Sequence, residues 1–227
     1  MPAWDSSTAS ASARTRPPPA RQVAQEPAVE LSPDELAEHE SALRGSARVT
    51  FATTRMPMVQ HDDLATDAAA EGLPLERARE ILREEWDRRV QLAQEHRDDD
   101  DSGAVRRAFV ALNAEGVLAV EALGYDNDEG HELATEEAGD VGAEGYVFFH
   151  AQDVERVVDG PGTLHLRYAA ARYTATSAAD KYAEDEAVGR RVVAALEDEG
   201  LAPTWDGSGA STITLERLRW YPVPGDA

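Results

Sequence analysis

The sequence predicts an α/β domain, with α+β as the alternative, in which a helical N-terminal half packs on a mixed sheet of four or five strands. Apolar residues recur at helical spacing between residues 75 and 93. Short apolar runs typical of strands alternate with helical segments from residue 117 onward. The 227 residues are enough for a single domain whose core needs no disulfide, and the chain has no cysteine to form one.

The segment at residues 1–30 is predicted to be a disordered tail, because it is rich in Ser, Ala, Pro and Arg and has few large apolar side chains. The globular domain is then expected to span residues 31–227. Its first helix is predicted to begin at Ser32, which can form a capping box with Glu35, and to end near Leu43. Pro33 suits the first position of this helix. Residues 47–60 fit a short strand or a packed loop equally well.

Three more helices are predicted before the first strand. One covers residues 62–70, and a long one runs from Pro74 to about residue 97. The inward stripe of the long helix consists of Leu75, Ala78, Leu82, Trp86, Val90 and Ala93. The Glu and Arg residues between them are expected to face water. After the acidic run at residues 98–101, a further helix turns Val105, Phe109 and Leu112 inward and ends at Gly116.

The C-terminal half alternates strands and helices. Strands are predicted at 117–120, 145–150, 164–168, 203–205 and 213–220, and helices at 151–158 and 185–199. In the last strand the apolar residues change parity between Leu215 and Leu218, which predicts a β-bulge near Glu216 and Arg217. The acidic segment Asp126–Glu132 has the oxygen density of a calcium loop, but its glycine is misplaced, so an exposed turn is the favoured interpretation.

Charge and composition limit the possible partners. The formal net charge is −22, from 44 acidic and 22 basic residues. A surface this negative repels phosphate groups, so we expect neither a nucleic-acid partner nor attachment to an anionic membrane. A basic protein is the partner that such charge favours, although a solvated acidic surface explains the same balance. The N-terminus has no apolar stretch of signal-peptide length, which predicts a cytoplasmic protein.

The strand-to-helix joint at residues 149–155 is the best candidate for a functional pocket, since such joints place polar side chains at the mouth of a crevice. The candidate pocket residues are His150, Gln152, Asp153, His165 and Asp206. His150 could carry a proton, and His165 would face it if the two strands are neighbours. The competing interpretation is that Gln152 and Asp153 cap a helix, while His165 and Arg167 lie on a solvated strand face.

Recognised catalytic signatures are absent from the sequence. It contains no Gly-x-Ser-x-Gly, no His-Glu-x-x-His and no phosphate loop ending in Lys-Ser or Lys-Thr. Without cysteine, thiolate metal sites and a cysteine nucleophile are excluded. No catalytic residue, cofactor or metal ligand is therefore assigned, and the balance favours a protein that is not an enzyme.

Several phrases of the sequence carry a resemblance to a family. They are Gly145–Glu155 (GYVFFHAQDVE) and Trp205–Gly209 (WDGSG), preceded by Glu84–Trp86 and Ala108–Leu112. In this order they resemble an uncharacterised actinobacterial family of the domain of unknown function 6891 type, over residues 62–220. The resemblance implies a fold but no reaction, cofactor or partner. Many members carry a cysteine cluster just after the first strand, which this chain lacks, so no thiol chemistry is implied here.

Two classes of function remain open. The leading hypothesis is a noncatalytic binding or regulatory module, and a well-formed polar pocket would count against it. One version is an acidic, immunity-like protein that neutralises a basic partner. The alternative is a metal-assisted hydrolase that uses His150 and Asp153 with His165 or Asp206, which requires these side chains to converge.

Overall fold

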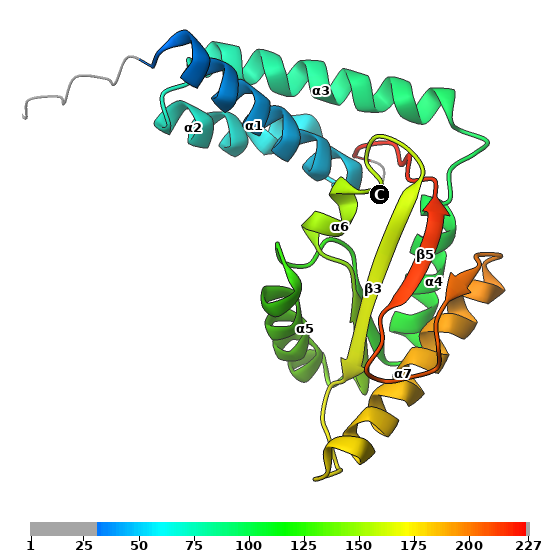
Figure 1. Ribbon diagram of the computed structural model, residues 1–227. Helices are drawn as coiled ribbons and strands as arrows, with labels where there is room; N and C mark the ends of the chain where they lie inside the picture. Colours follow the sequence, from blue (N-terminus) through cyan, green and yellow to red (C-terminus); the bar gives the residue numbers. More distant parts are fainter. Residues whose placement is uncertain (1–30, 226–227) are drawn as a thin grey trace, which may run out of the picture. The chain divides into compact units, whose positions relative to one another are not determined.

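The computed structural model describes residues 31–225, in which a helical N-terminal part packs on a five-stranded mixed sheet, as predicted (Figure 1). The predicted tail, residues 1–30, lies outside the described residues. The strand order is β1-β2-β3-β5-β4, with β1 and β2 parallel and the other neighbours antiparallel. The strands are β1 (Val117–Val120), β2 (Gly145–Phe148), β3 (Gly162–Ala170), β4 (Pro203–Thr204) and β5 (Ile213–Leu218).

The first helix, α1 (Pro33–Thr53), begins with the predicted capping box. Ser32 Oγ accepts a hydrogen bond from the Glu35 amide at 3.3 Å, and the Glu35 carboxylate accepts one from the Ser32 amide at 2.8 Å. The predicted end at Leu43 is wrong, because the helix continues to Thr53. Ala47 and Phe51 follow Leu43 on the same buried face, so packing carries the helix through the stretch interpreted as a strand or loop.

The next helices are a short 3-10 helix η1 (Met58–His61), α2 (Asp62–Ala70) and α3 (Leu75–Glu95). They pack with α1 around Phe51, Ala65 and Ile81. None of the helices within residues 31–225 is long and apolar enough to cross a membrane. The prediction that the charged residues of α3 face water is wrong at two positions. Glu85 and Arg89 are only 3% and 2% exposed.

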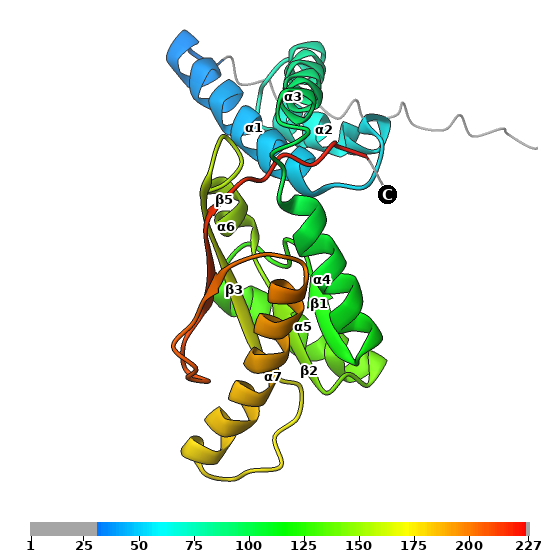
Figure 2. The ribbon, with the colours of Figure 1, turned by 90° about the vertical axis from the view of Figure 1, so that its right-hand side faces the viewer.

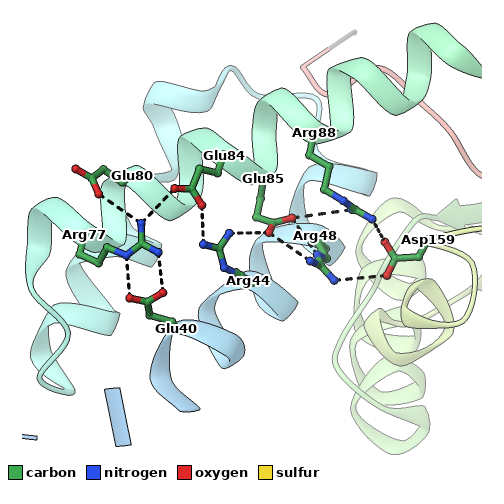
Figure 3. Close-up of polar contacts among 9 residues, drawn as sticks. All are labelled: Glu40, Arg44, Arg48, Arg77, Glu80, Glu84, Glu85, Arg88 and Asp159. Atoms are coloured by element: carbon green, nitrogen blue, oxygen red, sulfur yellow. Dashed lines mark hydrogen bonds and ion pairs between the residues drawn. The ribbon is translucent and has the colours of Figure 1, made fainter. Parts of the chain in front are cut away.

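Glu85 is buried because several arginines compensate its charge (Figure 3). Arg44 Nη1 and Arg48 Nε donate to its two carboxylate oxygens at 3.0 and 2.9 Å. Arg88 lies 4.0 Å from the same carboxylate. Arg48 and Arg88 also pair with Asp159, in the turn before β3, at 3.6 and 2.6 Å. The network therefore joins α1 and α3 to the sheet.

Arg89 makes a second connection between α3 and the sheet. Its guanidinium donates to the carbonyl oxygens of Trp220 (2.7 Å), Val158 (3.1 Å) and Pro222 (3.3 Å). Burial lowers the pKa of Arg89 to about 10, so it remains charged at neutral pH. The Trp220 indole nitrogen donates in turn to the Ala52 carbonyl at 2.9 Å. The segment after β5 is thus held between α1 and α3.

Helices cover the two faces of the sheet unequally. On one face, α4 (Ser102–Ala114) and α7 (Ala178–Asp198) lie side by side over the largest core cluster (Figure 2). On the other, α5 (Asn127–Val141) packs Ala134 and Ala138 against Tyr146 and Phe148. Its contacts are mainly with β1 and β2. The face of β3 beside α5 is therefore less covered.

Two further predictions from the sequence are wrong, one for residues 126–132 and one for the start of α7. Asp126–Glu132 does not form an exposed turn, because Asp126 Oδ1 accepts from the amides of Asp128 and Glu129 at 3.1 Å and caps α5. Helix α7 begins at Ala178, before the predicted residue 185, because Ser177 caps it. The β-bulge is confirmed by a shift of register between β3 and β5 and a positive φ of 54° at Arg217.

Neighbouring glutamates of α3 provide a matched test of the buried network. Glu85→Ala leaves arginines without their shared partner, so we expect the free energy of unfolding to fall by about 3 kcal/mol. Glu84→Ala removes a carboxylate that is half exposed and also binds Arg44, so a much smaller decrease is expected. Urea unfolding of both variants measures the difference, and equal losses would show that Glu85 has no special role.

Candidate functional site

The strand-to-helix joint predicted as a site is built around a buried carboxylate. Asp153, in α6 (Ala151–Glu155), is 0% exposed, and His150, which precedes the helix, is 3% exposed. The His150 amide donates to Asp153 Oδ2 at 3.2 Å. His150 Nδ1 also lies 3.2 Å from this oxygen but makes no hydrogen bond within residues 31–225. Burial lowers the pKa of His150, against the opposing effect of Asp153.

Two arginines compensate the charge of Asp153. Arg156 Nη1 donates to Oδ1 at 2.7 Å, and Arg167 Nη1 donates to Oδ2. Two guanidinium groups against one carboxylate leave this cluster with one net positive charge. A fully buried carboxylate requires such partners, because it has lost its hydration.

Arg167 occupies a different environment from the solvated strand face that the sequence suggested. It lies opposite Phe148 in the β2–β3 register, and its side chain is only 17% exposed. Its Nε donates at 2.8 Å to Asn127 Oδ1, in the first turn of α5. Asp153 and Asn127 together fix the direction of this guanidinium.

The other predicted residues have separate positions. His165 is half-buried in β3, and burial lowers its pKa against the effect of Asp153. The backbone N–H of Gln152 donates to the Tyr125 carbonyl at 3.4 Å. Asp206 is exposed and accepts hydrogen bonds from Ser208 and Ser211, both at 2.9 Å. The structure thus brings His150 and Asp153 together, whereas the contacts of Asp206 are within its own loop.

A polar pocket of about 420 Å³ lies beside Arg167, on the less covered face of the sheet. Tyr146 and Ala169 belong to its lining from the sheet, Asn127 and His131 from α5, and Tyr182 and Asp185 from α7, and residues 209–212 complete the wall. In Figure 1 these elements meet near the end of β3 that leads into α7. A volume of this size suits a small molecule.

His131 and Tyr146 form a hydrogen-bonded pair in the pocket. The Nδ1 atom of His131 lies 2.9 Å from the Tyr146 hydroxyl, to which Thr135 Oγ1 donates at 3.3 Å. Burial lowers the pKa of His131, Arg167 lowers it further, and Asp128 and Asp185 act in the opposite direction. Burial also raises the pKa of Tyr146. Both side chains are therefore neutral at pH 7, and the pair supplies uncharged hydrogen-bonding groups.

Asp185 places a negative charge in the same pocket. It is 6% exposed, and its Oδ1 accepts from the Ala170 amide at 2.8 Å and from the Tyr173 hydroxyl at 2.9 Å. Burial and the adjacent Asp185 raise the pKa of Tyr173. The pocket thus presents a cation, Arg167, and an anion, Asp185.

The WDGSG motif leads into one wall of this pocket, to which its last residue, Gly209, belongs. The Tyr168 hydroxyl donates to the Ser208 carbonyl and accepts from the Trp205 indole, both at 2.8 Å. Burial raises the pKa of Tyr168 to about 12. A Cβ atom at Gly209 would lie 2.1 Å from the Tyr182 carbonyl, so only glycine allows the loop to approach α7 this closely. Asp206 helps to shape this loop, because it accepts hydrogen bonds from Ser208 and Ser211.

Sequence reasoning missed His131, Tyr146 and Asp185. His131 lies in a segment whose sequence favours a turn, and the sequence around Asp185 indicates only the start of a helix. The one usable signal is Tyr146, whose hydroxyl needs a partner in a buried strand. Among residues 31–225, no group of three or more His, Asp or Glu side chains is arranged to hold a metal ion.

Comparison with protein families gives one match. A family described as "Domain of unknown function (DUF6891)" matches residues 32–222, a longer range than the resemblance in the sequence suggested. No curated protein and no solved structure matches the chain significantly. The pocket and the Asp153 cluster both lie within the matched range.

Replacing the buried carboxylate tests the support of the site. Asp153→Asn removes the charge that both arginines share, so we expect the free energy of unfolding to fall by about 2 kcal/mol. Glu155→Gln, an exposed change in the same helix, is the matched control and should have little effect. Chemical denaturation compares the two, and an Asp153→Asn variant as stable as the control would contradict the assignment.

The titration of His131 tests the electrostatics of the pocket. We expect an NMR titration of its ring to give a pKa below the ordinary value of about 6.5. The unfolded chain then takes up this proton at higher pH than the folded chain. The contribution to stability is therefore complete above about pH 6.5 and is lost as the pH falls toward the pKa of the folded state. A ring pKa of 6.5 or higher would contradict this environment.

Proposed function

The chain belongs to the DUF6891 family, and we propose that its domain is a noncatalytic binding module that holds a small polar molecule in the pocket beside Arg167. The observation that carries the proposal is the convergence of Arg167, Asp185 and the His131–Tyr146 pair on one cavity of about 420 Å³. Convergent polar groups in a cavity of this size are typical of ligand sites.

The polar pocket narrows the leading hypothesis. A well-formed polar pocket counts against a noncatalytic module in general, and here it counts against one that acts only through its outer surface. It is compatible with a module that senses or carries a small molecule, because the histidine of the pocket is hydrogen-bonded to Tyr146. A regulatory role fits this version, because a ligand that binds only the folded state changes the stability of that state.

The arrangement of the acid–base groups favours binding over hydrolysis. The hydrolase hypothesis needs His150 and Asp153 to act with His165 or Asp206. Asp153 is fully buried and shared by two arginines, and Asp206 bonds within its own loop. In the pocket, the Nδ1 atom of His131 is engaged by the Tyr146 hydroxyl, whose pKa is raised by burial, so this pair is suited to hydrogen bonding more than to supplying a nucleophile. The proposal therefore requires no reaction.

A thermal-shift screen of the full chain against common polar metabolites tests the proposal. We expect at least one compound to raise the melting temperature in a concentration-dependent way. Arg167→Gln should abolish this rise, because it removes the cation of the pocket. Arg172→Gln is the matched control, since Arg172 lies in a different concavity nearby, and it should keep the rise.

Two outcomes would contradict the proposal. One is a screen in which no compound raises the melting temperature. The other is a ligand whose effect survives in the Arg167→Gln variant, because that ligand would bind elsewhere.

A further inference from the structure

We propose that the pocket takes a zwitterion of the α-amino-acid type, whose carboxylate pairs with Arg167 and whose ammonium group pairs with Asp185. This inference rests on the proposed function and names the chemical class of its ligand.

The carboxylate side is provided by the guanidinium of Arg167. Its Nε donates to Asn127, and its Nη1 donates to Asp153 and to the His165 carbonyl. Within residues 31–225, Nη2 has no hydrogen-bond partner, although the residue lines the pocket. The surrounding cluster carries one net positive charge. Arg167 can therefore donate to a ligand carboxylate without breaking its contacts.

The ammonium side is provided by Asp185 and the tyrosines around it. Oδ1 of Asp185 accepts from Ala170 and Tyr173, whereas Oδ2 has no hydrogen-bond partner in the described part of the chain. Tyr173 and Tyr182 also line the pocket, and aromatic faces attract cations. Lys181 Nζ, 5.2 Å from the centre of the Tyr173 ring, shows that this environment accepts an ammonium group.

The charge balance favours a ligand that carries both signs. A simple anion would meet Asp185 and the net charge of −22, whereas a simple cation would meet Arg167. A zwitterion has no net charge and satisfies both groups. His131 belongs to the lining of the same pocket as Arg167 and Asp185. Neutral His131 then lies where it can bond to an uncharged part of the ligand.

Isothermal titration of the full chain with the twenty common L-α-amino acids tests the inference. We expect saturable binding of at least one. For the tightest binder, the matched carboxylic acid without the amino group and the matched amine without the carboxylate should each bind at least about 10-fold more weakly, which corresponds to about 1.4 kcal/mol.

Variants assign each charge of the ligand to its partner. Asp185→Asn keeps an oxygen acceptor for Ala170 and Tyr173 and removes the charge, so it should weaken the amino acid about 10-fold. The deaminated acid should bind as well or better, because the carboxylate that repels it is gone. Arg167→Lys keeps a positive charge but loses the planar pair of N–H donors that a guanidinium offers to a carboxylate. It should therefore weaken the binding of both the amino acid and the deaminated acid. Glu186→Gln, next to Asp185 on α7 and paired with Arg190, is the control and should bind normally. Circular dichroism confirms that each variant is folded.

The other outcomes overturn the inference. If the deaminated acid binds as tightly as the amino acid, or if Asp185→Asn has no effect, the ligand is an anion and not a zwitterion. If no amino acid binds but another metabolite requires Arg167, the inference fails and the proposed function stands. If no small molecule binds at all, both fail.

Discussion

The buried carboxylate of Asp153 is the constraint on which the site depends. Because it is fully buried, it needs hydrogen bonds from Arg156, Arg167 and the His150 amide. These contacts fix the start of α6 against β3 and direct the Arg167 side chain toward Asn127. One negative charge thus orients His150, which lies within the GYVFFHAQDVE motif, and the two arginines that follow the motif. Arg167, the cation of the pocket, is therefore held in place before any ligand binds.

Buried charges that need hydrogen-bonding partners also join the helical part to the sheet. Glu85 and Arg89 lie on adjacent turns of α3, and both are buried. Glu85 forms ion pairs with arginines, and Arg89 donates hydrogen bonds to three carbonyl oxygens. Buried charges of this kind add little net stability, but they strongly disfavour any arrangement that leaves them unpaired. They therefore specify how α3 and the segment after β5 meet.

Local features of the fold could be predicted from the sequence, and long-range ones could not. The capping box at Ser32, the order of the strands along the chain and the bulge near Arg217 follow from neighbouring residues. The burial of Glu85 depends on arginines about forty residues away. The pocket is a similar case, since His131 and Asp185 meet Arg167 only through sheet register and the packing of α5 and α7. Asp153 can be identified from the sequence because the helix cap that it forms is local, whereas its partner Arg167 cannot.

The most direct measurement is a crystal structure of the protein soaked with mixtures of small polar fragments. We expect electron density for fragments in the pocket, with carboxylates beside Arg167 and amines beside Asp185. This expectation would be contradicted if fragments gathered instead in the apolar groove lined by Met58, Val59 and Leu82 while the pocket held only water.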